Sequence, residues 1–219
     1  FTEKAGRKVE IKTPQKGEKL RLVEMAENNA KVTLENKEKD KLEVLTELKE
    51  VLKLDKLPRK IECFDISNLS GTNMVAGMSV MQDGVIKKNL ARRFRIKTVF
   101  SQDDPRCMNE VIKRRLTHSI DNPNGGFGKL PDVIFVDGGI TQIRAALEAI
   151  NELKKEYKEE NENFDVSILN IPIYGMVKDD KHSTRALMNK ERQELKLSNI
   201  LFNLITMFQD SVHDTAIGY

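Results

Sequence analysis

The sequence predicts an α/β fold: a mixed five-stranded sheet flanked by helices, preceded by a charged helical connector. Two observations lead to this prediction. Residues 1–57 hold 26 charged side chains and no aromatic residue after Phe1, so this segment cannot build a substantial core by itself. Residues 58–219 alternate between the apolar periodicities of strands and of helices. We therefore expect a charged helical connector at 1–57 and one α/β domain at 58–219.

The connector is expected to form one long helix or two. No Pro or Gly occurs from Glu18 to Leu54, and good helix formers dominate there. Its apolar residues recur at helical spacing in a narrow stripe, at Leu42, Leu45, Leu48, Val51 and Leu52. A solvated helix packed on the next domain explains this stripe more simply than a dedicated binding element does.

Three strands are expected in succession at the start of the domain. Residues 60–66 alternate and are rich in bulky apolar side chains, and residues 74–81 form a second such run after the turn-forming sequence NLSGTN. Asp83-Gly84 is a strong signal for a hairpin turn. The third strand, expected over residues 85–97, is therefore antiparallel to the second.

The rest of the domain is expected to alternate helices with strands. Helical periodicity covers residues 104–117, 141–157 and 198–217, strand-like runs cover 132–136 and 166–177, and loops are expected at 119–130 and 178–190. The run DVIFV at 132–136 is continuously apolar, as a parallel strand that is covered on both faces requires. The element order β-β-β-α-β-α-β-α is that of the ribonuclease-H-like fold.

Composition excludes several classes of protein. Hydrophobic residues make up 39% of the chain, and no stretch approaches the roughly 20 uncharged apolar residues of a membrane span. The N-terminus lacks the pattern of a signal peptide, and Cys63 and Cys107 are too few for a disulfide framework or a cysteine zinc site. We therefore expect reduced thiols in a cytoplasmic protein with no membrane partner. Because the chain lacks an initiator Met, we also expect it to be a piece of a longer protein.

Two aspartates are candidates for chemistry. Asp65 lies within an apolar strand, where a carboxylate is costly unless it is paired or binds a metal. Asp137 ends the run DVIFV, at the carboxyl end of a presumed parallel strand, where ligand sites of open α/β sheets lie. If these two strands are neighbours, the two carboxylates converge, and such a pair suits Mg²⁺ or Mn²⁺. The alternatives are a turn cap for Asp65 and a helix N-cap for Asp137.

The histidines and the basic residues are less specific by themselves. His118, His182 and His213 each have a simpler structural explanation, although His182 lies in a basic loop that could meet a phosphate. Residues 85–97 contain six cations and no acidic residue. Alternation would place Arg93, Arg95 and Lys97 on one face, which suits a phosphate track as well as it suits protection of an edge strand. Further cations follow at Lys178, Lys181 and Arg185.

Five ordered segments resemble the C-terminal nuclease domain of the UvrC family, which acts in bacterial nucleotide excision repair. They are IECFDISNLSGTN from Ile61, ARRFRIKT from Ala91, DDPRCMNEVIKRR from Asp103, LPDVIFVDGG from Leu130 and GMVKDDKHSTRAL from Gly175. The stretch VEIKTPQKGEKLRLVEMAENNA from Val9 resembles the connector before that domain. Several long matches in order are far more specific than any single one.

The resemblance implies a ribonuclease-H-like endonuclease with an Asp-Asp-His catalytic set that uses Mg²⁺ or Mn²⁺. The matching positions are Asp65, Asp137 and His213, which would be both the catalytic residues and the metal ligands. The sequence departs from the family's usual pattern at Ile140, Gln209, Ser211, Asp214 and Thr215. The candidate contacts to DNA phosphates are Arg93, Arg95, Lys97, Lys178, Lys181, His182 and Arg185.

The function implied by the resemblance is hydrolysis of a phosphodiester 5′ of a lesion in the damaged strand of double-stranded DNA. A UvrB-like helicase subunit would bind through parts of the full protein outside this chain. The role of His213, as metal ligand or general base, and the number of metal ions stay open. Either role is lost when the imidazole is protonated, so activity should fall in mild acid. The alternatives are a non-catalytic DNA-binding or scaffold domain, or another ribonuclease-H-like nuclease of the resolvase or RNase H type.

Overall fold

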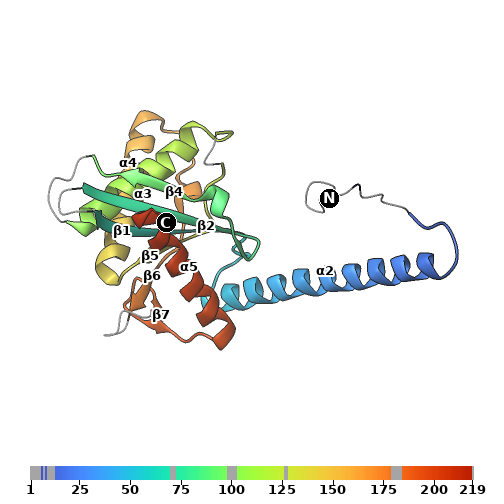
Figure 1. The fold of residues 1–219 in the computed structure, drawn as a ribbon. Coiled ribbons are helices and arrows are strands. Elements are labelled where there is room, and N and C mark those ends of the chain that lie inside the picture. Colours follow the sequence, from blue (N-terminus) through green and yellow to red (C-terminus); the bar gives the residue numbers. More distant parts are fainter. Residues whose placement is uncertain are drawn as a thin grey trace. The chain divides into compact units, whose positions relative to one another are not determined.

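The computed structural model describes residues 6, 8, 13–69, 73–97, 103–125, 128–178 and 184–218 (Figure 1). The chain divides into two compact units, Phe1–Lys41 and Leu42–Tyr219. Over the described residues the connector forms one helix, α2 (Glu18–Val51), which begins in the first unit and ends in the second. The helix is confirmed, and the domain boundary expected after residue 57 stays a prediction.

The last part of α2 contributes to the core of the second unit. Leu45 is buried, and Leu48 and Leu52 join an apolar cluster that also holds Ile61 and Phe208. This burial explains the apolar stripe that the sequence places at the end of the connector, because an amphipathic helix buries its apolar face against a neighbouring layer.

The second unit is built on a mixed sheet. Its strands, as far as the chain is described, are β1 (Lys60–Leu69), β2 (Asn73–Gln82), β3 (Val85–Ile86), β4 (Arg92–Arg95), β5 (Val133–Asp137), β6 (Ile173–Lys178), β7 (Thr184–Met188) and β8 (Glu194–Leu195). The order is β3-β2-β1-β5-β6-β7-β8, and β4 also pairs with β2. Strands β1, β5 and β6 are parallel, and the other pairs are antiparallel. The ribonuclease-H-like fold class is confirmed.

The described sheet has eight strands, whereas the sequence predicts five. The expected third strand is broken by a 3-10 turn, η1 (Lys88–Leu90), into β3 and β4. Part of the basic segment that was expected to be a loop forms β7, which pairs with β6 and carries the additional strand β8. Ala186 and Leu187 of β7 are buried. This burial is why a strongly basic segment nevertheless joins the sheet.

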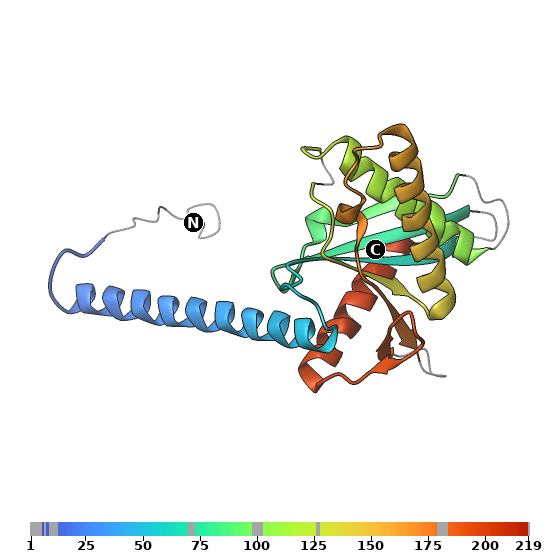
Figure 2. The ribbon, with the colours of Figure 1, turned by 180° about the vertical axis from the view of Figure 1, so that it is seen from behind.

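Helices cover both faces of the sheet. Helices α3 (Asp104–Asp121) and α4 (Ile140–Glu160) lie on one face, and α5 (Asn199–Ile217) lies on the other (Figure 2). In β5, Ile134 and Val136 pack in the cluster of α3 and α4, whereas Val133 and Phe135 pack in the cluster of α5. The predicted burial of DVIFV on both faces is confirmed. None of the helices in the described part of the chain has the length and apolarity to cross a membrane.

A buried ion pair joins α3 to the sheet. Arg115 of α3 donates to Glu62 of β1, and both side chains are fully buried. Arg115 also donates to Ser119 and to the backbone oxygen of Lys129, and Ser119 donates to that of Gly128. These bonds fix the segment that leads into β5, and with it the start of the strand that ends at Asp137.

Candidate active site on β1 and β5

Asp137 is the last residue of β5, and Asp65 lies within the neighbouring parallel strand β1, just past the point where the pairing of the two strands ends. Phe64 of β1 pairs with Val136 of β5, and each aspartate is the next residue along its strand. The side chain of Asp65 is 9% exposed and that of Asp137 is 6% exposed. The fold therefore brings two mostly buried carboxylates to the edge of the sheet where open α/β folds bind ligands.

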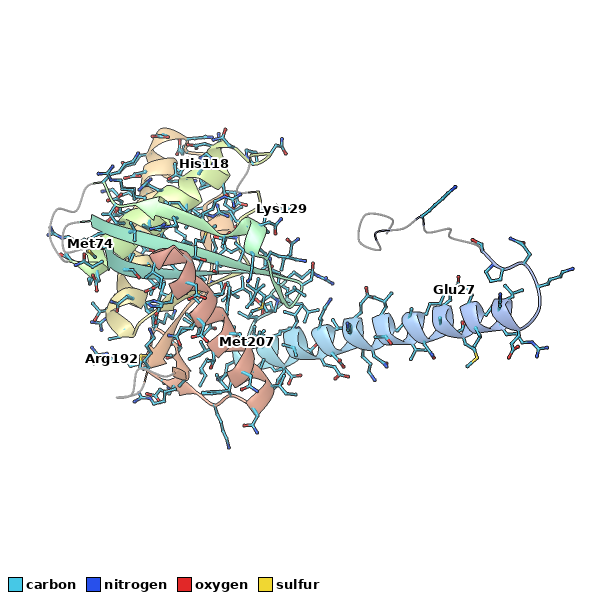
Figure 3. The ribbon with its side chains drawn as sticks, in the orientation of Figure 1. Glu27, Met74, His118, Lys129, Arg192 and Met207 are labelled. Carbon is cyan, nitrogen blue, oxygen red and sulfur yellow. The ribbon has the colours of Figure 1, made fainter. Side chains whose placement is uncertain are left out.

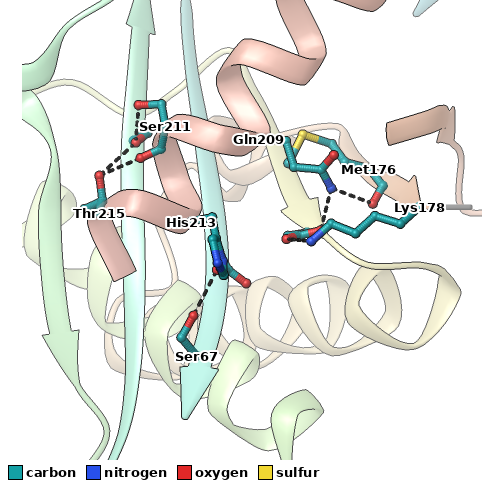
Figure 4. A network of polar contacts seen from close by, with 10 residues as sticks. Ser67, Met176, Lys178, Gln209, Ser211, His213 and Thr215 are labelled. Atoms are coloured by element: carbon teal, nitrogen blue, oxygen red, sulfur yellow. Dashed lines mark hydrogen bonds and ion pairs between the residues drawn. The ribbon is translucent and has the colours of Figure 1, made fainter. Parts of the chain in front are cut away.

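Helix α5 brings His213 to Asp65. Nδ1 of His213 lies 3.0 Å from Oδ2 of Asp65, and the Ser67 hydroxyl donates to the same oxygen at 3.1 Å (Figure 4). The His213 side chain is 52% exposed, so the imidazole can also meet a ligand from solvent. His118 lies instead on α3, in the helix layer on the other face of the sheet (Figure 3), and His182 lies outside the described residues.

A close approach between α5 and β2 positions His213. Gly77 of β2 is paired with Asp65 in the register of β1 and β2. A Cβ atom at Gly77 would lie 2.6 Å from the backbone nitrogen of Ala216 and 2.6 Å from the backbone oxygen of Val212. The helix therefore lies at a distance that only glycine allows, directly over the row of the sheet that contains Asp65.

Three hydroxyl groups join α5 to β2 beside this contact. Ser79 Oγ lies 3.1 Å from Ser211 Oγ and 3.2 Å from Thr215 Oγ1 (Figure 4). Ser211 and Thr215 are two of the positions where the sequence departs from the family's usual pattern around the histidine. In this chain they bond to the sheet, which helps to fix the helix that carries His213.

Both carboxylate oxygens of Asp137 accept hydrogen bonds. The Gln209 side-chain amide of α5 donates to Oδ1 at 2.6 Å, and the Lys178 ammonium at the end of β6 donates to Oδ2 at 2.8 Å. The Gln209 amide also donates to the backbone oxygen of Met176 at 3.4 Å. Asp137 is thus held by one neutral and one cationic donor (Figure 4).

The charge of Asp137 adds to the cost of ionising Asp65. Burial and the nearby negative charge of Asp137 raise the pKa of Asp65, while hydrogen bonds from His213 and Ser67 act in the opposite direction. The same environment raises the pKa of the Cys63 thiol well above its usual value, through burial and then through Asp137 and Asp65. The negative charge at this edge therefore favours a bound cation.

The donor chemistry fits a hard divalent cation. Carboxylate oxygens are the ligands that Mg²⁺ and Mn²⁺ prefer, and an imidazole suits Mn²⁺ as well. Within the described residues, however, no three His, Cys, Asp or Glu side chains are grouped so that they could hold an ion as they stand. Gln209 and Lys178 each donate to one oxygen of Asp137, and the ammonium of Lys178 would repel a divalent cation that binds the same carboxylate.

Two of the predicted DNA contacts, Arg93 and Arg95, lie on β4, two strands away from Asp65 on β1. Arg93 of β4 pairs with Gly77, which pairs with Asp65, and Arg95 lies two residues further along the same face. Both arginines are exposed, while Phe94 between them is buried on the other face. Strand β4 is two strand spacings, or about 10 Å, from strand β1, which carries Asp65. Lys97 is also exposed.

The remaining predicted contacts are in and after β6. Lys178 is bonded to Asp137, so it belongs to the carboxylate site. Arg185 of β7 is ion-paired with Glu194 and is 49% exposed. Lys181 and His182 lie outside the described residues.

Ser67 and Gln209 were not predicted to contact the two aspartates, although each carries a signal. Ser67 lies two residues after Asp65 in a strand, and Gln209 lies four residues before His213 in a helix. These spacings place each pair of side chains on one face of its element. Serine and glutamine are common outside functional sites. Only their spacing from Asp65 and His213 could have indicated a role.

Comparison with known families gives matches over nearly the whole chain. The family model described as the UvrC RNAse H endonuclease domain matches residues 49–217, and one described as the UvrC Ribonuclease H-like domain matches residues 1–37. UvrABC system protein C of Acetivibrio thermocellus is 40% identical over 99% of this chain and 36% of that protein. Its counterpart from Clostridium acetobutylicum is 39% identical over 100% of this chain and 36% of that protein.

Some solved structures match this chain at low identity and with low TM-scores. They include Endonuclease V of Ciona intestinalis in complex with a 24mer DNA, at 14% identity, 63% coverage of each chain and a TM-score of 0.32. The C-terminal lobe of a budding yeast Argonaute matches 68% of this chain and 32% of that chain, at 16% identity and a TM-score of 0.33. Likenesses this weak carry no functional argument.

The family assignment rests on the sequence matches. The chain spans about a third of the length of the curated relatives, since it covers 36% of each. The matched endonuclease model includes all the strands and helices of the second unit from the end of α2 to α5. The two aspartates and the histidine lie inside that match. The chain therefore belongs to the UvrC family, and residues 49–217 correspond to its RNase H endonuclease domain.

Proposed function

We propose that this chain is the part of a DNA repair nuclease that hydrolyses a phosphodiester 5′ of a lesion in the damaged strand, with Mg²⁺ or Mn²⁺ as cofactor. The observation that carries the proposal is the convergence of Asp65 and His213, 3.0 Å apart, beside Asp137 on the adjacent parallel strand. The relatives are named as components of a UvrABC system. The partners would therefore be damaged double-stranded DNA and a UvrB-like helicase subunit, and the enzyme would work in the cytoplasm.

The chemistry divides among three side chains. Asp65 and Asp137 would hold the divalent cation, which supplies a more acidic water and neutralises charge on the phosphate and the leaving oxygen. His213, half exposed and bonded to Asp65, would complete the ligand set or move the proton of the attacking water. Both roles use a ring nitrogen of His213 that carries no proton.

Cations in β4 and just after it would position the nucleic acid. Arg93, Arg95 and Lys97 are exposed along one edge of the sheet, beside the row that contains Asp65. Contacts to phosphates fix the register of a duplex without reading its bases. Such contacts suit an enzyme that cuts at a lesion and not at a sequence. Arg185, Lys181 and His182 would extend this track beyond β6.

The test compares variants of the complete protein on damaged duplex DNA loaded with the helicase partner in Mg²⁺ or Mn²⁺. Asp65→Ala and Asp137→Ala are each expected to reduce the 5′ nick about a thousandfold or more. His213→Ala should reduce it by about 10²- to 10⁴-fold. The matched controls are Asp83→Asn, in the turn at the other end of the β1–β2 pair, and His118→Ala, on α3.

Each failure has a distinct meaning. If the nick survives all three changes, the proposed site is wrong. If no variant, including wild type, nicks the strand 5′ of the lesion although the DNA is loaded, the chain acts as a DNA-binding or scaffold domain. If wild type cuts undamaged DNA without a loading partner, it is another type of ribonuclease-H-like nuclease.

A further inference from the structure

Asp137 is held by two side chains that differ in charge, burial and freedom. Gln209 is neutral and 3% exposed, and its amide bonds Asp137 Oδ1 and the backbone oxygen of Met176. Lys178 is cationic, its side chain is 35% exposed, and it bonds Asp137 Oδ2. The Gln209 side chain is therefore buried, whereas the Lys178 side chain is partly exposed; Figure 4 shows the contacts of both.

Lys178 lies at the end of β6, beside an irregularity in the pairing with β7. The register of the two strands shifts between Val177 and Lys178, and the extra residue, Arg185, is on β7. Such irregularities are over-represented beside active sites. Asp137, the last residue of β5, pairs with Met176, so Lys178 lies two residues further along β6 and on the same side of that strand as Met176.

The charges at this edge do not balance. Asp65 and Asp137 each contribute one negative charge when ionised, and Lys178 contributes one positive charge, while Gln209 and Ser67 are neutral. A divalent cation in place of the ammonium would compensate both carboxylates. The same replacement would release a cation at the surface, next to the position where a phosphate has to bind.

We propose that Lys178 is a built-in counter-cation of the site: it holds Asp137 until a divalent cation binds, is displaced by that cation, and then binds a phosphate of the nucleic acid. Gln209 stays in place throughout and keeps the second oxygen of Asp137 oriented. This inference rests on the proposed function, because it takes Asp65 and Asp137 as the metal ligands. It adds a step that the catalytic set alone does not contain, namely competition between a side chain and the metal.

The inference is tested by Mn²⁺ binding to the 219-residue chain without DNA, measured by calorimetry. Removing a competing ammonium should strengthen metal binding, so Lys178→Met is expected to bind Mn²⁺ about three- to tenfold more tightly than wild type. Lys178→Arg keeps the competing cation and should bind like wild type or more weakly. Lys190→Met is the matched control, because it removes the same charge from an exposed lysine that is paired only weakly with Glu191, at 3.8 Å.

A second measurement follows the lysine itself. After reductive methylation with ¹³C-formaldehyde, the resonance that is missing in Lys178→Arg is assigned to Lys178. Addition of Mg²⁺ to wild type should move this resonance, and addition of a short DNA duplex should move it again. In Asp137→Asn the Mg²⁺ response should be lost. The affinity of Lys178→Met for the duplex in Mg²⁺ should fall about threefold or more, as expected for the loss of one phosphate contact.

The outcomes separate this inference from the proposed function. If Lys178→Met binds Mn²⁺ no more tightly than wild type, while Asp65→Asn and Asp137→Asn abolish binding, the site is a metal site and the displacement of Lys178 is wrong. If Lys190→Met strengthens binding as much as Lys178→Met does, the effect is one of net charge, and the inference is equally wrong. If none of these chains binds Mn²⁺, the metal dependence of the proposed function fails first.

Discussion

The buried carboxylate of Asp65, which is proposed to bind the metal ion, lowers the stability of the metal-free domain. Burial and the neighbouring Asp137 raise its pKa, so the folded state favours the neutral carboxyl group more than the unfolded state does. At neutral pH the ionised group therefore lowers the stability of the metal-free domain. This cost disappears as the pH falls below the raised pKa, because the carboxyl group is then protonated in the folded protein.

Because Asn carries no charge, Asp65→Asn is expected to stabilise the metal-free protein while it abolishes incision. With a chelator at pH 7, the variant should have a higher Tm than wild type, since it lacks the buried charge. Its advantage should shrink as the pH is lowered from 7 toward 4. Thermal unfolding at both pH values checks this, with the exposed Asp83→Asn as control. A Tm equal to or below that of wild type at pH 7 contradicts the account.

At the scale of elements, the contact between α5 and β2 decides where the histidine lies. Gly77→Ala would place a Cβ atom 2.6 Å from two backbone atoms of α5, and backbone cannot give way as a flexible side chain can. We expect a loss of about 1–3 kcal/mol in the free energy of unfolding. Since the displaced helix carries His213, incision should fall more than the stability loss explains at a temperature where the variant is fully folded.

Gly139→Ala provides the matched control for stability. A Cβ atom at Gly139 would meet nothing within 4 Å, and we expect the free energy of unfolding to change by less than about 1 kcal/mol. Denaturant unfolding of both variants measures the difference. Equal stabilities would mean that α5 is not seated on Gly77 as described, and unchanged incision by a folded Gly77→Ala would mean that the position of α5 is not critical.

At the scale of the whole molecule, strands β1, β2, β5 and β6 and the four main helices could be predicted because their apolar patterns are strong. The run DVIFV is buried on both faces, and the alternation of residues 60–66 matches a strand covered on both sides. The division of residues 85–97 into β3 and β4 could not be predicted, because a 3-10 turn of Lys-Asn-Leu leaves no Gly or Pro signal. Strand β7 could not be predicted because its two buried residues, Ala186 and Leu187, stand in a strongly basic segment.

The candidate site, like the fold, could be predicted only in part. Asp65 and Asp137 could be paired from the rule that parallel strands end at one edge, and His213 came from the resemblance alone. Gln209 and Lys178 could not be assigned to Asp137, because their contacts depend on how α5 and β6 meet across the sheet, which no local pattern encodes. Lys178 was expected to contact a phosphate, which stays a prediction, and its bond to Asp137 was not expected.

The extent of the folded unit can be tested by truncation. The compact unit starts at Leu42, and Leu45, Leu48 and Leu52 are buried in it, at 3%, 0% and 3% exposure. A chain that begins at residue 42 should therefore unfold cooperatively with a Tm close to that of the full chain. A chain that begins at residue 58 lacks all three leucines. Since one buried leucine is worth about 2–5 kcal/mol, we expect it to lose on the order of 10 °C in Tm or to remain unfolded.

Single substitutions in the full chain show whether a loss of stability in the truncated chain comes from the missing buried leucines or from the shorter chain. Leu48→Ala should cost about 2–5 kcal/mol in the free energy of unfolding, because Leu48 is fully buried. Leu34→Ala, on the same helix but 62% exposed, should cost less than about 0.5 kcal/mol. If the chain from residue 58 is as stable as the chain from residue 42, and Leu48→Ala is harmless, the folded domain begins after the connector, as the charge pattern predicts. If both changes are costly, the end of the connector is part of the nuclease core, and the boundary lies within α2.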